Sequence, residues 1–388
     1  MRIGFLFNHD QIHQVAHSLP IALALAEAGT GAEIIVATTS DALRAEVERI
    51  ARASIARGQI ELVSLELTRG SSRALAAAAE WLVPARKLLL YRDNIAFFRS
   101  LDVLVVAEKT SLLLKARYGL ERLKIVHTRH GAGDRAIGFD QASPGFDHVL
   151  VSGAKIRDRL IGEAGVAAER ISIVGYPKFD LHAETRTALP FDEERPVVLY
   201  NPHPSPHLSS WYRQGREVLD WFVAHPEYQL IFAPHVMLFQ RKFVVSVDKF
   251  RIDRAGELPE HCRVAPNILV DLGSRASTNM AYTNRADIYL GDVSSQFYEY
   301  LVRPRPCVFL NTHRVRWQGD ANYLHWQAGP VIEDVAQLGA ALAEAVRDQE
   351  GVYRPVQERL FAASFDLTDE PSSQRAARVI AQVAGLAV

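Results

Sequence analysis

Short apolar segments that alternate with helix-sized stretches are the feature that most constrains the fold of this chain. The apolar run Ile3–Phe7 is followed by a polar turn and by a helical stretch over Ile12–Ala28, which Gly29 closes. A second strand is expected at Glu33–Ala37, and another helix follows it. Strands that are buried on both faces read as continuous apolar runs. The alternation therefore predicts a mostly parallel sheet with helices on both faces.

The same alternation continues in two series. Further strands of the first series are expected at Ile60–Leu67, Val103–Ala107, Lys124–Thr128, His148–Ser152 and Ile171–Gly175. Strands of the second series are expected at Val197–Tyr200, Gln229–Ala233, Asn267–Asp271, Ile288–Leu290 and Cys307–Leu310. The polar, charged stretch Leu181–Pro196 between them is predicted to be a linker. We expect an α/β protein of two doubly wound, Rossmann-like domains that face a cleft.

The length of 388 residues fits this organisation. We place an N-terminal Rossmann-like domain at residues 1–187 and a C-terminal one at 188–355. Residues 356–388 are predicted to be a helical segment that packs back on the N-terminal domain. Val335–Arg347 and Arg375–Leu386 are the helices expected at this end of the chain.

The composition excludes several classes of protein. Hydrophobic residues make up 48% and charged residues 23%, which supports a buried core rather than disorder. Lys and Arg (44) balance Asp and Glu (45), so the overall charge gives no case for a nucleic-acid partner. The two cysteines, Cys262 and Cys307, predict neither a disulfide framework nor a metal site. With no signal-peptide pattern at the start, a cytoplasmic location is expected.

Ligands of open α/β sheets bind beyond the carboxyl ends of the strands, and a polar segment, His130–Arg135, follows one predicted strand. His130 can act as a general base, and Asp134 can orient it. Gly131 allows close backbone approach to a ligand, and Arg135 can pair with a phosphate. The alternative is a tight turn with solvated charges.

A second candidate follows the strand Ile288–Leu290, where Asp292 precedes the pair Ser294 and Ser295. These serines are at the expected start of a helix over Phe297–Val302, where free N–H groups and the helix dipole favour anions. Ordinary helix capping is the alternative.

Histidines follow other strands. His235 comes after the strand at 229–233, and His203 lies in a loop that prolines stiffen. Each of these two histidines can face the cleft and contact a ligand. The alternative is a surface histidine in a loop that has no functional role. His9 and His13, with His17, have a spacing of four, which on a helix would place them on one face near an acceptor. The alternatives are a zinc pair and a partly exposed helix face.

The stretch 81–99 mixes bulky apolar and basic residues. Such a face can make peripheral contact with the inner face of an anionic membrane. It can also pack on the sheet with its arginines in solvent.

Taken in order, several motifs resemble the CDP-glycerol glycerophosphotransferase family, the teichoic-acid polymerases and primases, from about Val105 to Arg378. The matching segments are His130–Arg135, Gly175-Tyr176-Pro177-Lys178-Phe179-Asp180, Pro234-His235, Asp292–Glu299 and Asp369 with Arg375. The departures are Ala132, Arg135, Glu299 and Glu370 within these motifs, and Asn201–Pro204 in place of a Thr-Trp-Arg segment.

The resemblance implies a GT-B fold, with an acceptor-side N-terminal domain and a nucleotide-donor-binding C-terminal domain. It implies transfer of glycerol phosphate or a similar group from a CDP-linked donor to a glycan or lipid-linked acceptor, in synthesis of a cell-surface polymer. No cofactor is required. His130, Asp134 and His235 are the implied catalytic residues. Donor and phosphate contacts are assigned to Gly131, Arg135, Gly175, Pro177, Asp292, Ser294, Ser295 and Arg375; His9, His13 and His203 are assigned to the acceptor side.

Two alternatives remain open on the sequence. The chain can be a UDP-sugar glycosyltransferase or a UDP-N-acetylglucosamine 2-epimerase-like enzyme, an alternative that the many histidines and the missing Thr-Trp-Arg segment keep open. It can also be a non-catalytic binding module with the GT-B fold, because fold alone does not fix function.

Overall fold

The computed structural model describes residues 1–9, 11–79, 85–129, 131–135, 139–191, 194–240, 244–246 and 251–387. The chain divides into two compact units. Unit 1 comprises Met1–His130, Ile137–Leu181 and Ser364–Val388, and unit 2 comprises Gly131–Ala136 and His182–Ala363. Each unit has its own parallel sheet, which confirms the predicted α/β class.

The sheet of unit 1 has seven strands in the order β3-β2-β1-β4-β5-β6-β7, and all neighbours are parallel. Its strands are β1 (Arg2–Phe7), β2 (Glu33–Thr38), β3 (Glu61–Ser64), β4 (Val103–Val106), β5 (Lys124–Thr128), β6 (His148–Val151) and β7 (Ile171–Ile173). All seven were predicted. The strand order reverses between β1 and β4, as in doubly wound sheets.

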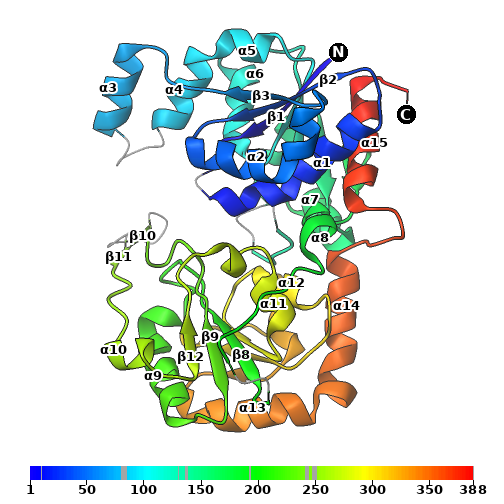
Figure 1. Ribbon diagram of the computed structural model, residues 1–388. Coiled ribbons are helices and arrows are strands. Elements are labelled where there is room, and N and C mark those ends of the chain that lie inside the picture. Colours follow the sequence, from blue (N-terminus) through cyan, green and yellow to red (C-terminus); the bar gives the residue numbers. More distant parts are fainter. Residues whose placement is uncertain are drawn as a thin grey trace. The chain divides into compact units, whose positions relative to one another are not determined.

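Helices cover both faces of this sheet, as the buried apolar strands require. They are α1 (Val15–Glu27), α2 (Asp41–Ala56), α3 (Gly70–Ala79), α4 (Ala85–Asp93), α5 (Ile95–Arg99), α6 (Leu113–Ala116), α7 (Ala154–Gly162), α8 (Pro177–His182) and α15 (Ser372–Ala384). Figure 1 shows α15, in red, beside α1, in dark blue.

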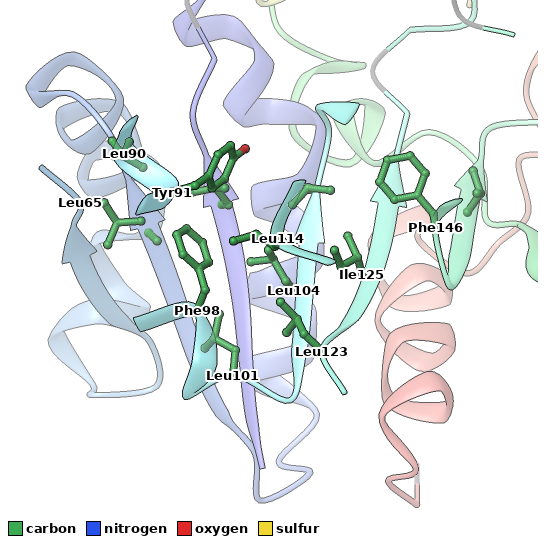
Figure 2. Packing of buried hydrophobic residues seen from close by; sticks show 14 of the residues in the cluster. Leu65, Leu90, Tyr91, Phe98, Leu101, Leu104, Leu114, Leu123, Ile125 and Phe146 are labelled. Carbon is green, nitrogen blue, oxygen red and sulfur yellow. The ribbon is translucent and has the colours of Figure 1, made fainter. Parts of the chain in front are cut away.

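Within the described part of the basic stretch, residues 85–99, the larger apolar side chains belong to the core or pack against it. Figure 2 shows Tyr91 and Phe98 packed with Leu104 of β4, and the first two are fully buried. This packing uses the apolar side chains that a membrane-facing helix would have to expose, so the described residues give no support to membrane contact. Trp81–Pro84 lie outside the described residues. Among those that are described, no helix is long and apolar enough to cross a membrane.

The C-terminal helix α15 is fixed to unit 1 by the Gly-x-Pro-x-x-Asp motif. Gly175 has a φ of 81°, and a Cβ there would clash with Ser372 Oγ and lie 2.9 Å from the carbonyl oxygen of Asp366. The Asp180 carboxylate accepts the N–H groups of Ser372 and Ser373 and so caps the start of α15. The motif therefore joins the end of the sheet to the last helix.

We expect Gly175→Ala to lower the free energy of unfolding of the protein by about 2–4 kcal/mol, because a left-handed backbone and a close approach to Ser372 both disfavour a side chain. Chemical denaturation followed by circular dichroism measures the change. The matched control is Gly162→Ala at the end of α7, where nothing lies within 4 Å of the added Cβ. Equal stability of the two variants would contradict the prediction.

The sheet of unit 2 has six parallel strands in the order β12-β9-β8-β13-β14-β15. They are β8 (Val197–Asn201), β9 (Gln229–Phe232), β12 (Ile268–Val270), β13 (Ile288–Gly291), β14 (Cys307–Leu310) and β15 (Val331–Ile332). The helices are α9 (Trp211–Ala224), α10 (Glu260–Arg263), α11 (Ala281–Arg285), α12 (Gln296–Tyr300), α13 (Leu338–Arg347) and α14 (Arg354–Ser364). The two-residue β15 and the antiparallel pair β10 (Val244–Ser246) and β11 (Arg251–Asp253) were not predicted.

Candidate functional site

Polar loops gather at the carboxyl ends of three neighbouring strands of unit 2. The loop 202–210 follows β8, His235 follows β9, and the segment 292–295 follows β13. Because β8 lies between β9 and β13 in a parallel sheet, these loops emerge side by side at one edge. The segment Gly131–Arg135 also belongs to unit 2 and contacts the same edge.

Asp292 holds the loop 202–210 in place. Its Oδ1 accepts the main-chain N–H groups of His203 (2.9 Å) and Val293 (2.6 Å). Its Oδ2 accepts the N–H (2.7 Å) and hydroxyl (2.9 Å) of Ser210. Asp292 is 1% exposed, and burial raises the pKa of its carboxyl, a rise that these four hydrogen bonds limit. Its side chain, assigned to donor contacts from the sequence, thus positions the loop that carries His203.

Two partly buried imidazoles lie at this edge, with ring centroids 6.3 Å apart. Burial lowers the pKa of His235 to about 4. Burial, and then Arg135, His235 and His207, lower the pKa of His203 well below its ordinary value. Both rings are therefore neutral at pH 7. His235 Nδ1 accepts the N–H of Met237 (3.3 Å), which leaves its proton on Nε2.

Both ring nitrogens of His203 face N–H donors. The N–H of Ser205 is 3.0 Å from Nδ1, and Arg135 Nη1 is 3.1 Å from Nε2. A neutral imidazole has one N–H and one acceptor nitrogen. In one of these two contacts, therefore, an N–H group faces another N–H group. An oxygen acceptor that lies beside both Arg135 Nη1 and His203 Nε2 can accept from each, and phosphate oxygens suit this role.

The segment 131–135 is anchored through Asp134, which is 2% exposed. Its Oδ1 accepts the hydroxyl of Tyr298 (2.6 Å), and its Oδ2 accepts the main-chain N–H of His325 (3.0 Å) and lies 2.9 Å from His325 Nδ1. His325 Nε2 is 2.9 Å from the carbonyl oxygen of Asp292, which also accepts Trp326 Nε1–H (2.7 Å). This network fixes the backbone that carries Arg135.

The serine pair lies against the same segment. A Cβ on Gly133 would be 3.2 Å from Ser295 Cβ, and a Cβ on Gly131, which has a φ of 101°, would be 3.8 Å from Ser295 Oγ. Ser295 is exposed, and Ser294 Oγ accepts the N–H of Gln296 (3.3 Å). The helix α12 has only five residues and begins one residue before the predicted start. Its dipole is correspondingly small, so hydroxyl and N–H groups contribute more than the dipole to an anion site.

Three residues assigned to phosphate from the sequence lie in unit 1. Gly175 and Pro177 belong to the motif that holds α15. Arg375 donates to the carbonyl oxygens of Asp366 (2.6 Å) and Ile173 (3.2 Å) and pairs with the Asp366 carboxylate (2.5 Å). These contacts all lie within unit 1, where they join the last helix to the end of the sheet.

The predicted row of histidines on one helix is wrong. The helix α1 begins at Val15, after a 3-10 turn over Ile12–Gln14, and the backbone at Gln11 is extended. His9 precedes this turn, so it cannot stack with His13 on a helix face. It is 5% exposed, and its Nδ1 lies 3.6 Å from Glu108 Oε1 at the end of β4.

Glu108 also pairs with Lys87 (2.8 Å). Burial raises the pKa of the Glu108 carboxyl, but hydrogen bonds from His9 and Lys87 outweigh this and lower it overall. His9 and Glu108 thus form a polar cluster at the switch point of the unit 1 sheet, between β1 and β4.

Sequence reasoning missed Ser210, Tyr298, His325 and Trp326. Ser210 lies near the predicted polar loop that carries His203, and Tyr298 lies within the motif Asp292–Glu299, so both positions had a signal in the sequence. His325 and Trp326 lie in the 3-10 segment Ala321–Ala328, which follows no predicted strand directly. His130, the predicted base, lies outside the described residues.

Comparisons with known proteins identify the fold. No protein-family model and no curated protein sequence matches the chain. Solved structures do, and the wall teichoic acid polymerase TagF, in a variant soaked with CDPG, matches with a TM-score of 0.62 at 14% identity over 99% of this chain and 88% of that one. The chain has a GT-B-like fold. The prediction of that fold from the sequence is confirmed.

Other matches have the same fold. The complex of Staphylococcus aureus MnaA with UDP gives a TM-score of 0.61 at 14% identity, over 100% of this chain and 97% of that one. HepE from Anabaena, in complex with UDP and glucose, gives 0.53 at 14% identity over 99% of both chains. At this identity the likeness establishes the fold alone.

Proposed function

We propose that this chain is a transferase that moves a phospho-alcohol, such as glycerol phosphate, from a CDP-linked donor to a hydroxyl of a glycan or lipid-linked acceptor. The observation that carries the proposal is His203 at the strand ends of unit 2, whose two ring nitrogens both face N–H donors, one of them on Arg135. A diphosphate oxygen is a hydrogen-bond acceptor with the charge and size that Arg135 and His203 require.

The surrounding groups extend this site along a diphosphate. His235 carries its proton on Nε2, and Ser295 has an exposed hydroxyl beside Gly131 and Gly133. Neutral imidazoles and hydroxyls orient the diphosphate, and Arg135 supplies positive charge. The matching TagF variant was soaked with CDPG, which supports a CDP-linked donor for this fold.

We propose the following reaction. The acceptor oxygen attacks the β-phosphorus and forms a new P–O bond, while the bond from that phosphorus to the bridging oxygen breaks and CMP leaves. His130 takes the proton of the acceptor hydroxyl. Arg135 and His235 stabilise the charge that develops on the departing CMP phosphate. Asp134 positions the backbone of Arg135 through His325 and Tyr298.

A UDP-sugar enzyme, a glycosyltransferase or a 2-epimerase-like protein, is the second candidate. The MnaA and HepE structures are both complexes with UDP, and His203 stands in the loop where the glycerophosphotransferase family has Thr-Trp-Arg. The same diphosphate contacts serve a UDP-linked donor. The two candidates therefore differ in the nucleobase of the donor and in the group that is transferred.

Thermal-shift titration of the protein with CDP-glycerol and with UDP-N-acetylglucosamine tests the choice, because a ligand of the folded state raises the melting temperature. We expect the larger shift with the CDP-linked donor, and release of CMP when an acceptor hydroxyl is supplied. We expect His130→Ala to abolish turnover and to retain the shift. A shift with the UDP-linked ligand only would favour the second candidate, and normal turnover by His130→Ala would remove His130 as the base.

A further inference from the structure

Three different metal-ligand side chains meet on the surface of unit 2, away from the loops described above. They are Asp220 on α9 and the neighbouring residues His261 and Cys262 on α10. Figure 1 shows α10 beside α9. The α9 helix leads back to the start of β9, and α10 leads to the start of β12. The group therefore lies toward the amino ends of these strands, whereas His203 and His235 follow carboxyl ends.

The spacing of the three groups is close to that of a tetrahedral metal centre. Cys262 Sγ is 3.7 Å from Asp220 Oδ1, and His261 Nε2 is 2.6 Å from the same oxygen. All three ligand atoms lie within 4.8 Å of one another. Zinc bonds of ordinary length place tetrahedral ligand atoms about 3.3–3.6 Å apart. The sulfur–oxygen distance already fits, and only the histidine must move away from the carboxylate.

The side chains that must move are free to do so. The side chains of His261 and Asp220 are 58% and 54% exposed. Either side chain can therefore rotate slightly into solvent without a clash with packed neighbours. Cys262 is fully buried in the core cluster of unit 2 and provides a fixed point. One rigid thiol with two adjustable partners at the surface leaves a fourth position open to water, as in metal sites that exchange their ligand.

We propose that Asp220, His261 and Cys262 form a binding site for Zn²⁺ or a similar borderline-soft divalent cation. Thiolate and imidazole ligands select such ions over Mg²⁺ and Ca²⁺, which take oxygen ligands. On binding, the cation replaces the thiol proton of Cys262, which is released to solvent, and it replaces the hydrogen bond between His261 and Asp220. The bound ion joins α9 to α10.

Burial, together with the adjacent Asp220 carboxylate, raises the pKa of the Cys262 thiol to about 11. Cation binding displaces the thiol proton, because cysteine ligates a metal as the thiolate.

Cobalt(II) is the probe, because a Co²⁺–thiolate bond gives a near-ultraviolet charge-transfer band that carboxylate and imidazole ligands do not give. The full-length protein is treated with a chelator under a phosphine reductant and titrated with Co²⁺. We expect the band at one equivalent and its loss when Zn²⁺ is added. We expect Cys262→Ala to lose the band and to weaken Zn²⁺ binding by about 100-fold or more.

The other cysteine provides the matched control. Cys307 is also buried, on β14, and belongs to no ligand group among the described residues. Cys307→Ala should keep the band. If Cys262→Ala folds poorly, the exposed variants His261→Gln and Asp220→Asn test the site instead, and both should weaken Zn²⁺ binding. A wild-type protein without the charge-transfer band, or a band that Cys262→Ala retains, would overturn the proposal.

Discussion

Replacing Asp292 with asparagine is expected to lower the free energy of unfolding of unit 2 by about 2–4 kcal/mol and to abolish donor binding. Both carboxylate oxygens accept main-chain N–H groups, from His203 and Val293 on one side and Ser210 on the other. Whichever way the new side-chain amide is oriented, its NH₂ faces at least one of these donors. A buried N–H group without an acceptor costs about 1–3 kcal/mol, and loss of the charge adds to this.

Donor binding fails in this variant because the loop 202–210 carries His203 and is tied to Asp292 at both of its ends. Denaturant titration measures the stability, and isothermal calorimetry with a CDP-linked donor measures the binding. Asp334→Asn, the same change at an exposed cap in unit 2, is the control, since Asn caps a helix about as well as Asp. Unchanged stability of Asp292→Asn would show that its hydrogen bonds do not hold the loop.

Replacing His235 with alanine is expected to weaken the binding of a CDP-linked donor by about 10- to 100-fold, with little change in stability. This is the value of one hydrogen bond to a charged acceptor. The ring offers Nε2–H in its neutral form and is only partly buried, so water can reach the N–H of Met237 when the ring is removed.

The same residue makes binding depend on pH. In the free protein burial holds the pKa of His235 near 4, and a bound diphosphate raises it because the anion favours the protonated ring. Donor binding therefore takes up protons, and affinity increases as the pH falls from neutrality toward about 4, the pKa of His235 in the free protein. Calorimetry across this range should show a smaller slope for His235→Ala. The control His225→Ala, at the end of α9, should keep both affinity and slope. A slope unchanged in His235→Ala would exclude this imidazole from the diphosphate site.

The alternation of apolar segments was sufficient to predict the parallel sheets. A strand that is buried on both faces is apolar at every position, so it stands out in the sequence as a continuous apolar run. Twelve strand segments were expected, and each overlaps a strand of the structure. The elements that were missed, β10, β11 and β15, have two or three residues each. Runs this short have no measurable period, so only their neighbours make them strands.

Strand ends also located part of the candidate site. His203, His235, Ser294 and Ser295 follow strands that are neighbours in the sheet, so their grouping follows from strand order, which the doubly wound topology restricts. Arg135 was predicted to contact phosphate, but its pairing with His203, 68 residues away, depends on tertiary structure.

The amino-acid sequence alone determined the α/β class with two doubly wound sheets and the polar segments at the carboxyl ends of the strands, because these depend on local periodicity and on topology rules. The GT-B-like fold was implied by the resemblance of the chain's motifs to a known family. Tertiary structure alone decided what each polar group contacts. It assigned Asp292 to a loop, Gly175 and Arg375 to the last helix, and His325 to Asp134. Tertiary structure also placed the Asp220 carboxylate beside the Cys262 thiol. Hydrogen bonds between residues far apart in the chain leave no periodic signal in one sequence, since only the packing of the whole chain brings their partners within reach of one another.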